Sequence, residues 1–173
     1  MSDLAIGAIV ALVFAAAMEP WARLLHGRVW HGRLWGVHRS HHEPRLGWFE
    51  QNDVLSALHA PIAAALVVVG CQLVPGALGA ALIGAGTGMT LFGVAYLVVH
   101  DGLVHKRLPV RFLARIPWLK RVRRAHLVHH STGGPPYGLF LGPQELARSS
   151  AARPTPAREQ AKEHAPAGAE GTS

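Results

Sequence analysis

Two apolar stretches, VLSALHAPIAAALVVVGCQLV at residues 54–74 and GALGAALIGAGTGMTLFGVAYLVV at residues 76–99, decide the fold of this chain. Neither stretch contains Asp, Glu, Lys or Arg. Each has the length that an α-helix needs to cross a bilayer, which is ~20 residues. Their glycines are typical of membrane helices, where small residues let backbones pack closely. We therefore expect a membrane hairpin rather than two buried helices of a soluble core.

A third apolar run precedes this hairpin, from Leu4 to Trp21, and it is shorter and carries Glu19. A cleaved signal peptide is the alternative, because the segment FAAAME offers small residues for cleavage. However, Asp3 and the lack of Lys or Arg before the run differ from a signal sequence and favour a retained helix. The sequence therefore predicts an all-α, integral membrane helical bundle with three to four membrane helices.

The basic residues orient this bundle. The formal net charge is +7, and 13 of the 17 Lys and Arg residues follow the first or the third apolar run. They are Arg23, Arg28, Arg33, Arg39 and Arg45, and then Lys106, Arg107, Arg111, Arg115, Lys120, Arg121, Arg123 and Arg124. Three crossings place both segments on one side, which the positive-inside rule makes cytoplasmic. Nucleic-acid binding, the other usual explanation of a basic chain, does not account for the apolar runs.

The composition changes near residue 147. Residues 147–173 are rich in Ala, Pro, Ser, Gly and charged residues, and no large apolar residue follows Leu146. Such a composition is typical of a disordered tail. We therefore expect one membrane domain at residues 1–146 and a disordered tail at 147–173.

Ten of the 12 histidines follow one pattern, written twice. An H-x4-H pair precedes an H-x2-H-H box each time. The first copy is His26, His31, His38, His41 and His42, and the second is His100, His105, His126, His129 and His130. The remaining two, His59 and His164, are isolated and are expected to be ordinary core or surface residues.

The spacing has a geometric meaning. Residues i, i+3 and i+4 share one face of an α-helix, so each H-x2-H-H box presents three imidazoles together. Residues i and i+5 do not share a face, and those pairs fit a helix end or a π-type distortion. Pro44 is expected to end the helix of the first box, and Gly32 and Gly36 leave open whether His31 lies on the same helix.

Imidazole is a ligand for iron, zinc, copper and nickel. Ten histidines are too many for one ion, and the predicted topology brings both copies to the same membrane face. Structural zinc often uses cysteine, and this chain has one. Soluble di-iron bundles use Glu-x-x-His motifs, which these boxes are not. The pattern therefore predicts a histidine-rich dinuclear site at a membrane face and leaves the metal open.

Several segments resemble the bacterial β-carotene hydroxylases of the fatty-acid hydroxylase and sterol desaturase superfamily. They are HGRVWHGRLWGVHRSHHEP, FEQND, GMTLFGVAYLVVHDGLVHKRLPVRF and LKRVRRAHLVHH. The segment PYGLFLGPQEL is similar to the end of the plant non-haem carotene hydroxylases. The resemblance runs from about His26 to Leu146, and HDGLVH followed by AHLVHH is specific to the carotene branch, whereas the bare boxes are common to the superfamily.

This resemblance implies a non-haem di-iron monooxygenase that hydroxylates β-ionone rings at C3 and C3′, from β-carotene through β-cryptoxanthin to zeaxanthin. It implies two Fe ions held by all ten patterned histidines. O2 and reducing equivalents from ferredoxin or NAD(P)H would be co-substrates. The substrate would be a carotenoid dissolved in the inner (cytoplasmic) membrane.

Polar and aromatic residues near the boxes are further candidates. Ligating histidines usually donate their second N–H to a carboxylate or carbonyl. The candidates for this role are Asp101, Glu43, Glu50, Asp53 and Asn52. The alternative for the acids is pairing with nearby arginines, and for Asn52 it is a helix cap. The aromatic residues Trp30, Trp35, Trp48 and Phe49 are expected to form an interfacial belt rather than to contact substrate.

Two other functions fit parts of the sequence. A sibling enzyme acting on a sterol, a fatty acyl chain or another carotenoid would share the boxes. A non-catalytic membrane metal-binding or transport protein would need polar residues inside its crossings, and the second and third runs contain no carboxylate.

Overall fold

The computed structural model describes residues 1–44 and 47–152, and these residues form helices joined by short connections, which confirms the all-α prediction. Arg45, His164 and residues 153–173 of the expected tail lie outside the described residues. The elements are α1 (Asp3–Leu24), η1 (Leu25–Arg33), α2 (Trp35–His42), α3 (Asp53–Ala57), α4 (His59–Gln72), α5 (Gly76–Tyr96), η2 (Leu97–Val104), η3 (Arg111–Arg115), α6 (Pro117–Thr132) and α7 (Gly142–Ala152).

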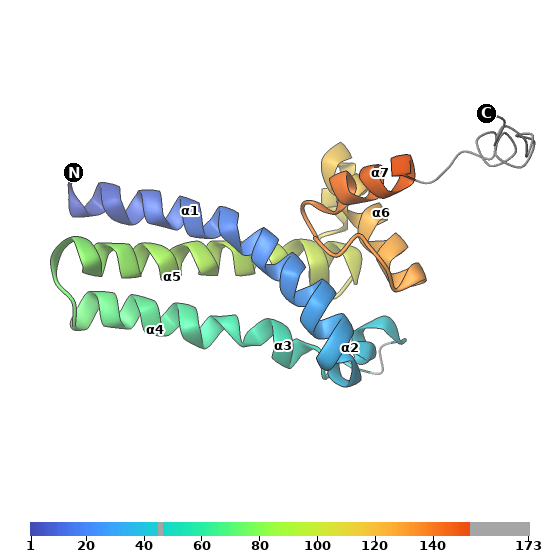
Figure 1. The fold of residues 1–173 in the computed structure, drawn as a ribbon, viewed down its shortest axis with the longest axis horizontal. Coiled ribbons are helices and arrows are strands. Elements are labelled where there is room, and N and C mark those ends of the chain that lie inside the picture. The colour runs from blue at the N-terminus through green and yellow to red at the C-terminus, as the bar shows by residue number, and fades with distance from the viewer. Residues whose placement is uncertain (45–46, 153–173) are drawn as a thin grey trace, which may run out of the picture.

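Three helical stretches of the described chain are long and apolar enough to cross a membrane: Asp3–Arg33, Asp53–Gln72 and Gly76–Val104. They confirm the three predicted runs. Helices α1, α5 and α4 lie side by side with α5 in the middle, and α2, α6 and α7 gather at one end of this bundle (Figure 1). The N-terminus and the α4–α5 turn lie at the other end.

Small residues on α5 allow its backbone to approach both neighbours. A Cβ added at Gly84 would lie 2.3 Å from the carbonyl oxygen of Gly7 on α1. A Cβ added at Gly86 would lie 2.5 Å from the carbonyl oxygen of Ala63 on α4. Since lipid supplies no hydrophobic drive for helix association, such close packing is what holds membrane helices together.

Glu19, the acid that weakened the prediction for the first run, has a structural role. Its Oε1 accepts a hydrogen bond from the backbone N–H of Leu141, at 2.8 Å, and its side chain is buried. Arg23, one turn later, forms an ion pair with Glu145 of α7. These contacts join the end of α1 to the segment that precedes and begins α7.

Both H-x4-H pairs lie at π-helical stretches, one of the two alternatives that their spacing predicted. Helix α1 continues into the π-helix η1, and α5 continues into the π-helix η2. The backbone N–H of His105 donates to the carbonyl of His100 at 3.0 Å, which is the i to i+5 bond of a π-helix. The chain kinks at Gly32, where φ and ψ are both −107°, so His31 and the first box lie on separate helices.

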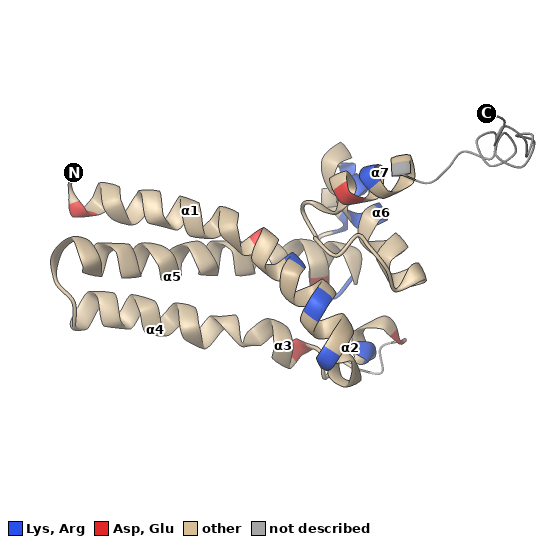
Figure 2. Ribbon diagram, viewed as in Figure 1, with Lys and Arg blue, Asp and Glu red and all other residues tan. Residues whose placement is uncertain are grey.

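The charges gather at one end of the bundle. Figure 2 shows Lys and Arg around α2, α6 and α7, whereas most of α1, α4 and α5 carries no charge. Both basic segments therefore lie at the same end of the apolar helices, as three crossings require.

The C-terminal boundary differs from the prediction. Helix α7 runs to Ala152, so residues 147–152 are helical rather than part of a disordered tail. The segment ARSSAA that follows Leu146 contains alanine and arginine, both good helix formers.

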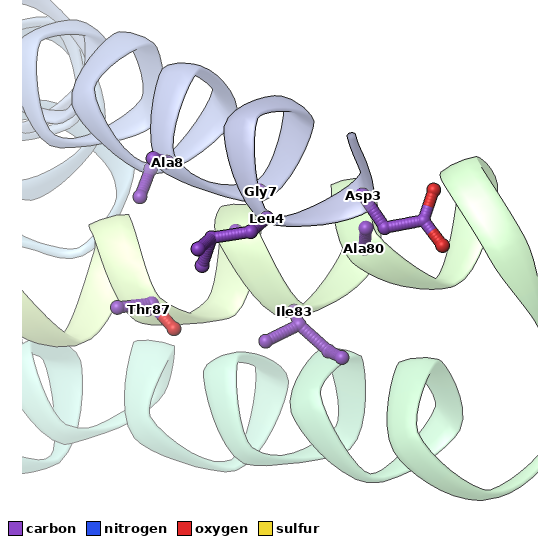
Figure 3. A pocket seen from close by; sticks show the side chains of 9 residues that line it. Asp3, Leu4, Gly7, Ala8, Ala80, Ile83 and Thr87 are labelled. Carbon is purple, nitrogen blue, oxygen red and sulfur yellow. The ribbon is translucent and has the colours of Figure 1, made fainter. Parts of the chain in front are cut away.

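A groove of about 400 Å³ lies between the start of α1 and α5 (Figure 3). It is lined by small and aliphatic residues, among them Leu4, Gly7, Ala80 and Ile83. It lies near the N-terminus, at the end of the bundle opposite α2 and α6, and is therefore remote from the histidines.

Candidate metal centre

The ten patterned histidines meet at the charged end of the bundle and form two groups. Nitrogens of the first group lie within 4.8 Å of one another, and so do those of the second. The first group is His26, His31, His38, His42 and His129, and the second is His41, His105, His126 and His130. His100 joins the second group, because its Nε2 lies 3.1 Å from Nε2 of His41.

Each group takes one histidine from the other copy of the motif. His38 and His42 of the first box lie in the first group, but His41 lies in the second. In the second box, His126 and His130 lie in the second group, but His129 lies in the first. The middle histidine of each box therefore crosses over, and neither group is complete without both halves of the chain.

The Nε2 atoms converge within each group. The Nε2–Nε2 distance is 3.1 Å for His31 and His129 and 3.3 Å for His42 and His38 in the first group. It is 3.1 Å for His130 and His126 in the second. Two nitrogens bound to one ion at ~2.1 Å, with an angle between tetrahedral and square, are separated by about 3.0–3.4 Å. The distances fit nitrogens that share an ion.

Hydrogen bonds of the Nδ1 atoms point to the same conclusion. In the second group, Nδ1 of His41 lies 3.1 Å from Glu50 Oε2, and Nδ1 of His100 lies 2.7 Å from Asp101 Oδ1. A carboxylate accepts, so each Nδ1 carries the hydrogen and each neutral ring turns an Nε2 lone pair toward the other. Two lone pairs 3.1 Å apart repel unless a cation lies between them.

The first group repeats this arrangement with neutral acceptors. Nδ1 of His26 donates to the carbonyl of Tyr137 at 2.8 Å. Nδ1 of His38 lies 2.6 Å from Oδ1 of Asn52, and Nδ1 of His129 donates to the carbonyl of Gly134 at 2.7 Å. The donor set, ten imidazoles in two groups, fits two ions of the iron or zinc type.

Of the residues predicted to orient histidines, Asp101 and Asn52 contact one directly, as does Glu50. Asp53 contacts Arg107 rather than a histidine, with 2.8 Å between Oδ1 and Nη1. Glu43 lies elsewhere: it forms an exposed i,i+4 pair with Arg39 at 3.1 Å. This pairing with arginine is the alternative that the sequence left open for the acids.

Four further residues support the site, and sequence reasoning did not find them. Tyr137 and Gly134 act through backbone carbonyls, which leave no signal in residue type. Gly133 ends α6 with φ of 68°, a conformation that favours glycine, and so turns the chain toward His129. Arg107 was counted only as one basic residue among many, and it is buried among acids.

The aromatic residues divide into two pairs. Trp30 is buried, with ring centroids 5.7 Å from His26 and 5.6 Å from His38, and Trp35 packs 5.2 Å from His31. Trp48 and Phe49 are exposed. Trp35 is exposed as well, so Trp35, Trp48 and Phe49 fit the expected interfacial belt and the buried Trp30 does not. The isolated His59 accepts a hydrogen bond from Trp21 at 3.0 Å and joins neither group.

Replacing Gly27 with alanine is expected to lower the metal content by about one ion per chain. A Cβ at Gly27 would lie 2.8 Å from Cδ2 of Tyr137, whose carbonyl holds His26. Moving Tyr137 disturbs the first group only. Elemental analysis of purified protein measures the change, and Gly36→Ala is the matched control, since nothing lies within 4 Å of its Cβ. Full metal content in Gly27→Ala would contradict the role of Tyr137.

The metal-free protein is expected to lose stability as pH falls from about 6.5 to 4. Burial lowers the pKa of His38 from 6.5 to about 4 despite its bond to Asn52, and burial likewise lowers the pKa of His129 to about 4. In this window the unfolded chain binds more protons than the folded chain, so acid favours unfolding. Thermal unfolding of the metal-free protein across this range tests it. An unfolding temperature that does not change across this pH range would contradict the presence of neutral, buried imidazoles.

Comparison with known proteins identifies the family of this chain. The profile of the fatty acid hydroxylase family matches residues 11–143. The chain is 52% identical over 143 residues to β-carotene hydroxylase 1, chloroplastic, of Capsicum annuum, covering 79% of this chain and 44% of that protein. It is 51% identical over 137 residues to β-carotene 3-hydroxylase 1, chloroplastic, of Arabidopsis thaliana, covering 76% and 43%.

A bacterial relative is covered more fully. The β-carotene hydroxylase of Pantoea ananas is 41% identical over 128 residues, covering 73% of this chain and 70% of that protein. The chain spans less than half the length of the plant relatives it matches. No solved structure matches significantly. The profile match covers most of the chain, including all ten patterned histidines, and on this basis the chain belongs to the fatty acid hydroxylase family.

Proposed function

We propose that this protein is a β-carotene hydroxylase, a non-haem di-iron monooxygenase that places hydroxyl groups on C3 and C3′ of the β-ionone rings. The observation that carries the proposal is the crossed arrangement of ten histidines in two groups at one end of an apolar bundle. The named activity of the relatives supports carotene as the substrate class.

The reaction consumes O2, two electrons and two protons for each C–H bond hydroxylated, and it yields an alcohol and water. An unactivated C–H bond gives acid–base or nucleophilic groups nothing to act on. Two bound iron ions would supply the activation of O2 that this chemistry needs. The ten histidines would hold these ions, five in each group.

Other residues of the chain orient the histidines and shield the site from water. Acceptors on Nδ1 hold each of five histidines in one tautomer and one ring orientation. A buried cluster that includes Val99, Leu103 and Val122 packs beside the second group, since Val99 precedes His100 and Val122 lies one turn before His126. Its effect is to exclude water from one side of the site.

The bundle explains how such a site meets its substrate. A carotene is a long hydrocarbon dissolved in the bilayer. The histidines lie at one end of three helices that are apolar enough to cross a membrane, which would bring them to a membrane face. The basic residues at this end favour a cytoplasmic orientation. They also suit an acidic electron donor such as ferredoxin, through electrostatic steering.

Cells that accumulate β-carotene provide the test. Expression of the chain is expected to give pigments with one and two added oxygens, separated by chromatography with mass detection. His129→Ala removes a ligand of the first group and is expected to abolish both products. His59→Ala is the matched control, since His59 bonds Trp21 outside both groups, and it is expected to retain activity.

The outcomes separate the alternatives. Unchanged pigments, with folded and iron-loaded protein in the membrane, would overturn carotene as substrate and favour a sterol, fatty acyl or other carotenoid substrate. Protein that is folded but binds no iron under these conditions would overturn the di-iron assignment itself.

A further inference from the structure

The two histidine groups differ in the charge of the groups that back them. In the second group the Nδ1 acceptors are carboxylates: Glu50 accepts from His41, and Asp101 accepts from His100. In the first group the Nδ1 acceptors are neutral. They are the backbone carbonyls of Tyr137 and Gly134, for His26 and His129, and the side-chain amide of Asn52, for His38. Among the Nδ1 hydrogen bonds described for the ten histidines, both bonds to carboxylates belong to the second group and all three bonds to neutral acceptors belong to the first.

Arg107 joins the charged acceptors into one network. Its guanidinium lies 3.0 Å from Glu50 Oε1, 2.8 Å from Asp53 Oδ1 and 3.8 Å from Asp101 Oδ2. The Arg107 and Glu50 side chains are each 9% exposed. Asp53 in turn accepts the backbone N–H of Glu50 at 2.9 Å. Glu50 and Asp101 come from segments far apart in sequence, and Arg107 is the residue that contacts both.

We propose that the two metal positions are unequal. The second group, backed by carboxylates, holds its ion more tightly than the first, and Arg107 is the positioning residue that sets this difference. A carboxylate on Nδ1 raises the basicity of the imidazole and so strengthens its bond to a cation. Losing such a partner typically costs 10–100-fold in metal affinity. The inference rests on the proposed binding of two ions and goes beyond it.

The network also explains why a buried cation lies so close to a metal site. Unpaired, the largely buried carboxylate of Glu50 would carry a desolvation cost, and the planar fork of arginine can contact Glu50 and its acidic neighbours at once. Arg107 holds the three carboxylates in place through its ion pairs with them. Its ion pairs with Glu50 and Asp101 connect it to His41 and His100, which these two acids contact.

Release of ferrous ion tests the inequality without any measurement of turnover. Purified full-length protein in lipid nanodiscs is loaded with Fe2+ without oxygen and mixed with an excess of a chelator that changes colour on binding Fe2+. Wild type is expected to release two ions in two phases whose rates differ by about 10-fold or more. Two ions released in one phase would overturn the proposal.

Reciprocal substitutions assign the phases. Glu50→Gln exchanges a carboxylate for an amide beside His41 and is expected to speed the slow phase about 10-fold. Asn52→Asp gives His38 a carboxylate and is expected to slow the fast phase, leaving the slow phase unchanged. Glu43→Gln is the matched control, because this exposed acid pairs with Arg39, and both phases should keep their rates.

Arg107 is tested in the same assay. Arg107→Ala is expected to speed the slow phase, and Arg107→Lys to restore it in part, since one ammonium cannot contact all three acids. Equal changes in both phases would indicate general loosening and would overturn the positioning role. The outcomes also separate the two proposals: fewer than two bound ions in wild type refutes the dinuclear site, whereas two ions of equal release rate refute only the inequality.

Discussion

A double variant lacking His41 and His130 is expected to retain one metal ion per chain, whereas a double variant lacking His41 and His42 is expected to retain none. The structure places His41 and His130 in the same group, 4.7 Å apart between ring centroids. His41 and His42 are neighbours in sequence but lie in different groups. Removing the first pair damages one position, and removing the second pair damages both.

Elemental analysis of the purified alanine variants measures the retained iron. The His42→Ala and His129→Ala pair, which the structure places together in the first group, is the mirror experiment and is also expected to leave one ion. All three double variants should lower hydroxylation by more than about 100-fold, since loss of a residue that only supports a ligand typically costs 10–100-fold in metal affinity or activity. If each box held its own ion, His41→Ala with His42→Ala would retain one ion and the pattern would reverse.

Replacing Gly84 with leucine is expected to prevent stable assembly of the bundle. A Cβ at this position would lie 2.3 Å from the carbonyl oxygen of Gly7 and 3.1 Å from its Cα, so the obstacle is backbone and cannot rotate away. Helix α1 would have to move from α5, and the end of α1 leads directly to His26. We expect a loss of more than about 3 kcal/mol, at the upper end for overpacking.

The matched control lies on the same helix. Gly93→Leu adds the same side chain at a position with nothing within 4 Å of its Cβ. Gly84 is buried against α1, whereas Gly93 is exposed on the same helix, so the two variants differ mainly in the approach of α1. Folded protein recovered from membranes, and its thermal unfolding in detergent, should fall for Gly84→Leu and stay near wild type for Gly93→Leu. Equal recovery of both would show that α1 and α5 do not depend on close contact.

Local features of the site could be predicted from sequence because they depend on spacing along one helix. The i, i+5 spacing of His100 and His105 conflicts with an α-helix, and the structure resolves the conflict with a π-helix, one of the two forms expected. Likewise, three apolar runs, two of them uncharged and of bilayer length, indicated the three long helices. The extension of α7 to Ala152 was missed, since composition separates helix from tail poorly in a segment of alanine, serine and arginine.

The assignment of ligands to ions could not be predicted in this way. Spacing fixes which side chains share a helical face, but His38, His41 and His42 share a face and still divide between two groups. Their division depends on where α6 and η2 pack against α2. The role of Arg107 and the carbonyl of Tyr137 likewise depend on contacts between segments far apart in the chain.

The sequence by itself therefore determined the membrane helices, the end of the bundle that carries charge and the ten candidate ligands, because each is a property of residue type and local period. Only the tertiary structure decided that the middle histidine of each box crosses to the other group and that carboxylates back just one of the two positions. These features arise where helices converge, and convergence is set by the close packing of α1, α4 and α5 rather than by the pattern on any one of them.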